Sequence, residues 1–158
     1  RSPFDVVVGS GYKWLLAGFG NGVMMVSETF LNHFQLKPQV IFERIFIGHF
    51  SILALASLHF AIQSLEEQGF EQLMQKKEAL AEQAKHKLGE GKWIGPWVLK
   101  RKQHSSIFVL EGAVGLYEHL IQNNINCAQR GKGVRVSFHY YNTEMDLDHL
   151  MEVLEQFS

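Results

Sequence analysis

The chain has 158 residues, of which 46% are hydrophobic and 20% are charged. This composition is typical of a folded globular protein and excludes an intrinsically disordered chain. The formal net charge of -1 gives no electrostatic reason to expect nucleic acid or an anionic membrane as a partner. No apolar run reaches the roughly 18 residues that a membrane-spanning helix needs. The single cysteine, Cys127, excludes an internal disulfide and is typical of a cytoplasmic protein.

The first part of the chain combines apolar runs with glycine-rich turns. Residues 4–8 predict a buried strand of a larger parallel sheet, whose neighbours would come from preceding residues of a longer protein. The pattern then predicts a strand over 23–26, a helix over 28–34, a loop over 37–50 and a helix over 52–65. This last helix is apolar nearly all round, and such a helix is normally buried on several sides.

The second part of the chain begins at Gly69, which interrupts the helical pattern. The expected elements are a long amphipathic helix over 70–88, a strand over 106–111, a helix over 114–122, strands over 125–129 and 134–140, and a last helix that Thr143 caps. This order predicts a small α/β unit in which helices cover a sheet.

Two positions near glycine turns could carry chemistry. Lys13 follows the first strand, and a lysine held near apolar groups can lose its proton and attack a carbonyl carbon. An ordinary surface lysine in a loop is the alternative. Gly48 and His49 precede the apolar helix, whose N-terminus can attract a phosphate group. Ordinary capping of that helix by Ser51 is the alternative.

A third candidate, Arg135, lies on the strand predicted over 134–140. Alternation places Val134, Val136, Phe138 and Tyr140 on one face and Arg135, Ser137, His139 and Tyr141 on the other. Arginine binds carboxylates through two parallel hydrogen bonds, although a solvent-facing sheet surface is equally consistent with the pattern. The other histidines show no spacing typical of metal ligands, and we expect Cys127 to be structural.

Two segments resemble the class V aminotransferases, a family of fold-type I enzymes that depend on pyridoxal 5′-phosphate (PLP). Residues 10–16, Ser-Gly-Tyr-Lys-Trp-Leu-Leu, with Gly-Asn-Gly at 20–22, are similar to the segment that carries the family's cofactor lysine. Residues 135–144, Arg-Val-Ser-Phe-His-Tyr-Tyr-Asn-Thr-Glu, are similar to its C-terminal signature. The resemblance implies an α/β fold that is the C-terminal portion of a PLP-dependent transferase. Residues 1–68 would be the end of the large PLP-binding domain, and residues 69–158 the small C-terminal domain.

The resemblance also implies roles for single residues. Lys13 would form the internal aldimine with PLP and then move the α-proton of an amino-acid substrate. Arg135 would bind the α-carboxylate of that substrate. Ser10 and Tyr12 would bind the cofactor phosphate, Tyr12 standing where the family usually has histidine.

Gly48 and His49 stand where the family has a Gly-Thr pair that reaches the phosphate of the neighbouring subunit, so the resemblance implies a homodimer with shared active sites. His49 departs from the usual threonine, and Asn21 replaces another usual threonine. The family's ring-stacking side chain and the aspartate that pairs with the pyridine nitrogen have no match in the chain, and Asp5 does not fit that position.

The predicted activity is that of a class V aminotransferase. A lyase of the selenocysteine-lyase or kynureninase type, or a truncated remnant without catalysis, are the alternatives. The family's cysteine desulfurases carry a nucleophilic cysteine on a loop well before the arginine strand. Cys127 lies only eight positions before Arg135, in an expected strand, which disfavours that chemistry.

Overall fold

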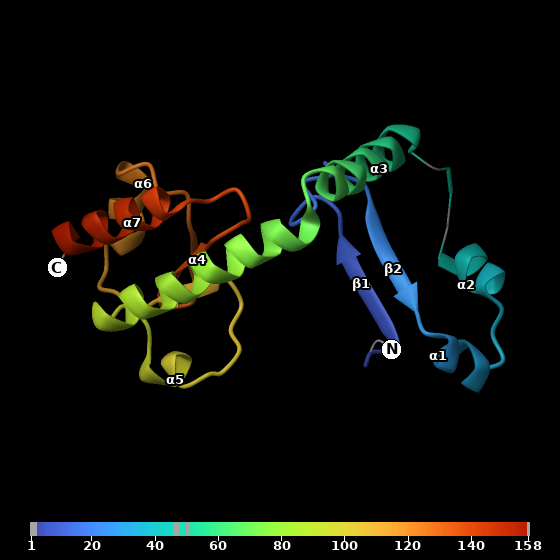
Figure 1. Ribbon diagram of the computed structural model, residues 1–158, viewed down its shortest axis with the longest axis horizontal. Helices are drawn as coiled ribbons and strands as arrows, with labels where there is room; N and C mark the ends of the chain where they lie inside the picture. The colour runs from blue at the N-terminus through green and yellow to red at the C-terminus, as the bar shows by residue number, and fades with distance from the viewer. Residues whose placement is uncertain (1–2, 46–47, 50, 158) are drawn as a thin grey trace. The chain divides into compact units, whose positions relative to one another are not determined.

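A computed structural model describes residues 3–45, 48–49 and 51–157. The chain divides into two compact units, Arg1–Gln68 and Gly69–Ser158. Each unit contains its own small sheet and its own helices (Figure 1). The expectation of a mixed α/β chain is therefore confirmed.

The sheet of the first unit is an antiparallel pair of strands, β1 (Val6–Ser10) and β2 (Gly22–Val26). The prediction of a buried strand in a parallel sheet is wrong for the described residues. The connection over 11–21 turns β2 back beside β1, so the pairing is antiparallel. Val6 and Val8 of β1 are exposed. Two strands alone form a marginally stable sheet, so β1 and β2 depend on what packs against them.

Two short helices follow the strands. In α1 (Glu28–His33), the Ser27 hydroxyl accepts a hydrogen bond from the Phe30 N–H at 3.1 Å, which caps the helix. Helix α2 (Pro38–Ile45) occupies most of the predicted loop, so that prediction is wrong there. Proline suits the first position of a helix, because an N–H at that position has no intrahelical acceptor. Positions 46, 47 and 50 of the predicted loop lie outside the described residues.

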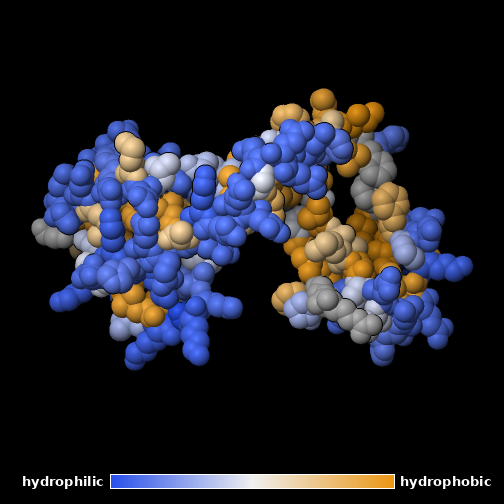
Figure 2. Space-filling model, viewed as in Figure 1, coloured by the Kyte–Doolittle hydropathy of each residue, from blue (hydrophilic) through white to orange (hydrophobic). Residues whose placement is uncertain are grey.

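Helix α3 (Ile52–Glu67) confirms the predicted apolar helix and extends it by two residues. Its buried side chains are Ala54, Leu58, Ala61 and Leu65. Ile52, Leu53 and Phe60 are 79%, 83% and 72% exposed, so the expected burial on several sides is wrong for the described chain. The described part of the first unit packs against one side of α3 only, and Figure 2 shows apolar side chains at the surface of this helix.

The second unit contains a three-stranded antiparallel sheet with β5 in its centre. Its strands are β3 (Ile107–Leu110), β4 (Ala128–Arg130) and β5 (Gly133–Ser137). Its helices are α4 (Phe70–Glu90), α5 (Pro96–Leu99), α6 (Leu116–Gln122) and α7 (Glu144–Phe157). Leucines of α4, α6 and α7 share one core with Phe108, Val134 and Val136 of the sheet. The prediction of a small unit in which helices cover a sheet is confirmed.

Two strand boundaries differ from the prediction. Ile125 does not join a strand, because its N–H donates to the Leu120 carbonyl at 2.9 Å and so closes the end of α6. The chain also leaves the sheet after Ser137, since the His139 N–H donates to Asn142 Oδ1 at 2.8 Å in a turn. Cys127 therefore precedes β4 rather than lying within a strand.

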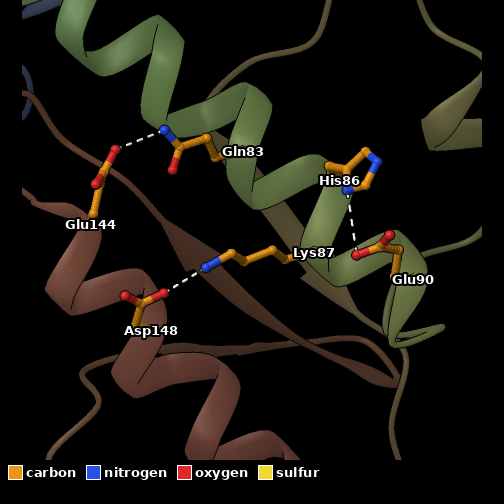
Figure 3. A network of polar contacts seen from close by, with 6 residues as sticks. All are labelled: Gln83, His86, Lys87, Glu90, Glu144 and Asp148. Carbon is orange, nitrogen blue, oxygen red and sulfur yellow. Dashed lines mark hydrogen bonds and ion pairs between the residues drawn. The ribbon is translucent and has the colours of Figure 1, made fainter.

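Polar side chains join α4 to α7 at the edge of this core (Figure 3). Lys87 Nζ lies 2.5 Å from Asp148 Oδ1, and Gln83 Nε2 donates to Glu144 Oε1 at 2.8 Å. Because these groups are largely exposed, each contact adds little to stability. The leucine side chains between α4 and α7 carry the packing of the two helices.

At the start of α7, the side chain of Asp146 binds Thr143, which is the part of the predicted cap that the hydrogen bonds show. Asp146 Oδ2 accepts hydrogen bonds from the Thr143 N–H at 2.7 Å and from the Thr143 hydroxyl at 3.2 Å. The bond from the Thr143 N–H is the main reason why the pKa of Asp146 lies below its usual value. Folding thus favours the charged form of the Asp146 carboxyl group.

We expect Asp146→Ala to lower the free energy of unfolding by about 1 kcal/mol at neutral pH. Because the pKa of Asp146 is lowered by folding, its contribution is complete above the unfolded value of about 3.9 and is lost as the pH falls through the folded pKa. Urea unfolding at several pH values, with the exposed Glu152→Ala as control, measures this difference. A loss that stays the same down to the most acidic pH would contradict it.

Candidate functional site

The turn over residues 11–17 presents Lys13 after the end of β1. The Ala17 N–H donates to the Gly11 carbonyl at 2.9 Å, and the Leu16 N–H donates to the Lys13 carbonyl at 3.2 Å. The Lys13 side chain is exposed, and its Nζ lies 5.4 Å from the centroid of the Tyr12 ring. The amine is therefore open to a carbonyl compound from solution, and an aromatic ring lies beside it.

A pocket of about 510 Å³ lies in the first unit. It is lined by Tyr12, Phe19, Gly20, Asn21, Gly22, His49, Ser51, Ala54 and Leu55. Tyr12 and His49, which the sequence singles out in two separate segments, thus share one pocket within a single chain. Neither Lys13 nor Ser10 is among these described lining residues. Lys13 lies near the lining residue Tyr12, whose ring stacks on that of Phe19 with the centroids 5.3 Å apart.

The N-terminus of α3 contributes to this pocket. The Ser51 hydroxyl accepts a hydrogen bond from the Ala54 N–H at 3.3 Å and caps the helix, so the predicted alternative of ordinary capping is confirmed. Capping uses one of the N–H groups of the first turn, and the helix dipole still favours a negative charge at this end. The Tyr12 phenol and the His49 imidazole add side-chain donors. The pocket can therefore hold a small anionic group.

Ser10 lies close to this pocket at the end of β1, where it is exposed. It is paired in register with Gly22, which lines the pocket. Gly22 allows the two strands to approach closely, because a Cβ there would lie 2.7 Å from the Gly9 carbonyl oxygen.

Gly48, the last predicted phosphate residue, has a φ of 119°, a backbone conformation that favours glycine. This conformation sets the direction in which the chain continues into His49.

Arg135 lies on β5, in the second unit, opposite Val109 of β3 and Ala128 of β4. Its side chain is half-buried, whereas Val134 and Val136 are each 5% exposed, so the predicted alternation is confirmed along β5. The guanidinium group belongs to the sheet face opposite the unit's core. Lys13 and Arg135 thus belong to different units of the chain.

The predicted polar face does not extend beyond Ser137, because His139 and Tyr141 lie in the turn that follows β5. There they form an aromatic cluster with Tyr140. The His139 ring centroid lies 4.3 Å from that of Tyr140 and 4.5 Å from that of Tyr141. The sequence shows three consecutive aromatic residues, but alternation alone assigned His139 and Tyr141 to the strand.

Cys127 is half-buried against the core of the second unit, and burial raises the pKa of its thiol. A raised pKa leaves less thiolate, the form that acts as a nucleophile. The surroundings of Cys127 therefore agree with a structural role.

The described residues show neither a metal-ligand cluster nor a membrane-spanning helix. In the part of the chain that the structure describes, no group of three or more His, Cys, Asp or Glu side chains could hold a metal ion. No helix of residues 3–45, 48–49 and 51–157 is long and apolar enough to cross a membrane. No family model matches the chain, and a search of curated proteins finds none that is significantly similar to it.

Proposed function

We propose that the chain is the C-terminal portion of a PLP-dependent aminotransferase of the class V group that acts on an amino acid. Residues 1–68 would close its large domain, and residues 69–158 would form its small domain. One observation carries the proposal: Tyr12 and His49 line one pocket at the N-terminus of α3, beside Lys13. The resemblance assigns Tyr12 to the cofactor phosphate of its own chain and His49 to that of the neighbouring subunit, so the shared pocket within one chain departs from the expected placement of His49.

The pocket suits a phosphate group in chemical kind. Its lining includes a tyrosine, a histidine and a serine at the N-terminus of a helix, and these residue types can donate hydrogen bonds to phosphate oxygens. In this arrangement Tyr12, His49 and Ser51 would bind the phosphate, with Ser10 close by. PLP supplies, when bound, an electron sink for the negative charge that develops at the substrate's α-carbon.

The residues of the chain then have distinct tasks. The Lys13 amine would hold the cofactor through its aldehyde, and the same amine would serve as the base that takes the α-proton of the amino acid and as the acid that returns it. The Arg135 guanidinium binds the substrate's α-carboxylate through two parallel hydrogen bonds and thereby orients the α-C–H bond. Lys13 belongs to the first unit of the chain, and Arg135 belongs to the second.

We also propose a homodimer. The support is the exposed apolar surface of α3, formed by Ile52, Leu53 and Phe60, which is unusual for a helix in contact with water. The contact of His49 with the pocket needs no second chain, since His49 and Tyr12 line it together. The dimer would instead cover the surface of α3.

The test is spectroscopic. The full-length protein that contains this chain is mixed with a slight excess of PLP, and its absorption is recorded before and after borohydride is added. We expect a visible band that borohydride removes, because reduction of a covalent lysine adduct destroys its conjugation. If the full-length wild-type protein shows no such band, the proposal is wrong, and the non-catalytic remnant is the alternative that stands.

A second expectation concerns the substrate. Arg135→Ala is expected to weaken amino-acid binding by roughly tenfold to a hundredfold, because a charge-assisted hydrogen-bonded pair contributes about 1.5–3 kcal/mol. Cofactor uptake should stay unchanged. Titration of the PLP-loaded chain with amino acids measures the affinity, with the exposed Arg130→Ala as a matched control. Equal loss of cofactor and substrate binding would show that Arg135 has a different role.

A further inference from the structure

We propose that Asn21 is a positioning residue, whose side-chain amide fixes the turn that carries Lys13 (residues 11–17) against the first turn of α3. The inference rests on the proposed function, because it assigns Asn21 to the placement of the Lys13 amine beside the phosphate pocket. Asn21 stands where the family that the chain resembles usually has threonine.

The Asn21 amide joins two segments that lie far apart in sequence. Its Nδ2 donates to the Ala17 carbonyl at 2.7 Å and to the Ala54 carbonyl at 3.0 Å. The Asn21 backbone carbonyl also accepts the Gly11 N–H at 3.2 Å. One residue therefore contacts both ends of the turn and the first turn of α3.

The end of the turn, Ala17, is buried, and its carbonyl accepts two hydrogen bonds. Ala17 is fully buried, and its carbonyl accepts a second hydrogen bond, from the Ser57 hydroxyl of α3, at 2.5 Å. Its N–H closes the turn onto the Gly11 carbonyl. Asn21 and Ser57 thus hold the same carbonyl from two directions, and the turn has little freedom to move relative to α3.

The shape of the turn matches the Asn21 side chain. A Cβ on Gly11 would lie 1.8 Å from Asn21 Oδ1, so the buried oxygen occupies space that only glycine leaves open. Asn21 Oδ1 has no hydrogen-bond partner among the residues that the structure describes. The opposite orientation of the amide would place this oxygen against two carbonyl oxygens, so Nδ2 must face Ala17 and Ala54.

Threonine, serine and aspartate cannot reproduce this arrangement. Threonine and serine carry one hydroxyl donor and cannot serve both carbonyls at once, and aspartate has the shape of asparagine but no N–H. Asn21 also lines the phosphate pocket together with Tyr12 and Ser51. The same amide therefore couples the position of Lys13 to that of the pocket.

The experiment compares wild-type chain, Asn21→Ala and the exposed Asn32→Ala control. The first measurement is hydrogen exchange at the Gly11 and Ala17 amides, which needs no cofactor. In the second, a low concentration of PLP and borohydride label the lysines, and the ratio of label on Lys13 to label on the exposed Lys37 is determined. Thermal unfolding shows that the variants compared are folded.

In Asn21→Ala we expect faster exchange at both amides and a Lys13-to-Lys37 ratio that falls by about tenfold, which corresponds to about 1.4 kcal/mol. General destabilisation would affect the two exposed lysines alike and leave the ratio closer to its wild-type value. Unchanged exchange and an unchanged ratio would overturn the inference. If Asn21→Ala does not fold, Ser57→Ala removes the other donor to Ala17 and should change both measurements in the same direction, and no change would overturn the inference.

The two proposals fail in different ways. If the wild-type chain shows no preference for Lys13, the proposed function is wrong, and exchange at Gly11 and Ala17 alone decides whether Asn21 fixes the turn. If the wild-type chain prefers Lys13 and Asn21→Ala keeps that preference, the function stands and the positioning role of Asn21 is wrong.

Discussion

Replacing Lys13 by alanine is expected to abolish the PLP band and the adduct that borohydride traps. The reason is chemical: the attachment requires a primary amine beside the phosphate pocket, and alanine supplies none. In the wild-type chain the amine is exposed, and it lies 5.4 Å from the centroid of the Tyr12 ring, which lines that pocket. Absorption spectra and the amount of cofactor retained after reduction measure the loss.

The matched control is Lys37→Ala, which removes an exposed lysine from the same unit. This variant should keep both the band and the trapped cofactor. Two results would contradict the assignment of Lys13: an undiminished band in Lys13→Ala, or an equal loss in both variants. Either would mean that PLP reacts with surface amines without selection.

The largest effect on stability is expected from Phe108→Ala in the second unit. Phe108 is 2% exposed and meets Phe138 in an edge-to-face contact, with ring centroids 6.2 Å apart. Removing a buried aromatic ring commonly costs about 3–5 kcal/mol, because the cavity collapses only in part. Since β3 pairs with β5, the strand that carries Arg135 would lose its support as well. Urea unfolding followed by circular dichroism measures the change.

Val109→Ala is the control, because Val109 is the next residue of β3 and faces the other side of the sheet, where it is 46% exposed. We expect this variant to lose about 1 kcal/mol or less. Similar losses in Phe108→Ala and Val109→Ala would mean that the core does not lie on the side of the sheet where the structure places it.

The second unit is the part that the sequence predicts best. Alternation along 134–138 identifies the buried and exposed faces of β5 because an antiparallel strand covered on one side repeats every two residues. The pair Thr143 and Asp146 identifies the start of α7 because helix capping is a local interaction. The ends of the strands were less predictable, since the His139 N–H bonds to Asn142 instead of a neighbouring strand.

The first unit shows why local patterns are insufficient. The pattern over residues 37–50 predicts a loop, yet proline is suited to the first position of a helix, and α2 begins at Pro38. The residues of β1 are compatible with parallel or antiparallel pairing, and only the position of β2 decides between them. The composition of α3 predicts burial on several sides. Burial also depends on which other segments pack against the helix, and the sequence of α3 does not specify these segments.

In the candidate site, some features follow from local sequence patterns and others depend on the packing of distant segments. Tyr12 and His49 were each predicted from their own segment, whereas their meeting in one pocket depends on the packing of α3 against the turn. Asn21 was noticed as a departure from threonine, but its contact with the Ala54 carbonyl joins residues 33 positions apart. No local pattern predicts such a contact.

The most direct measurement is to identify the lysine that PLP modifies in the wild-type chain. The chain is treated with less than one equivalent of PLP, reduced with borohydride, digested and analysed by peptide mass spectrometry. Attachment through the amine beside the Tyr12 pocket predicts that the label is found on the peptide that contains Lys13. Label distributed over the exposed lysines of both units, without enrichment at Lys13, would contradict it.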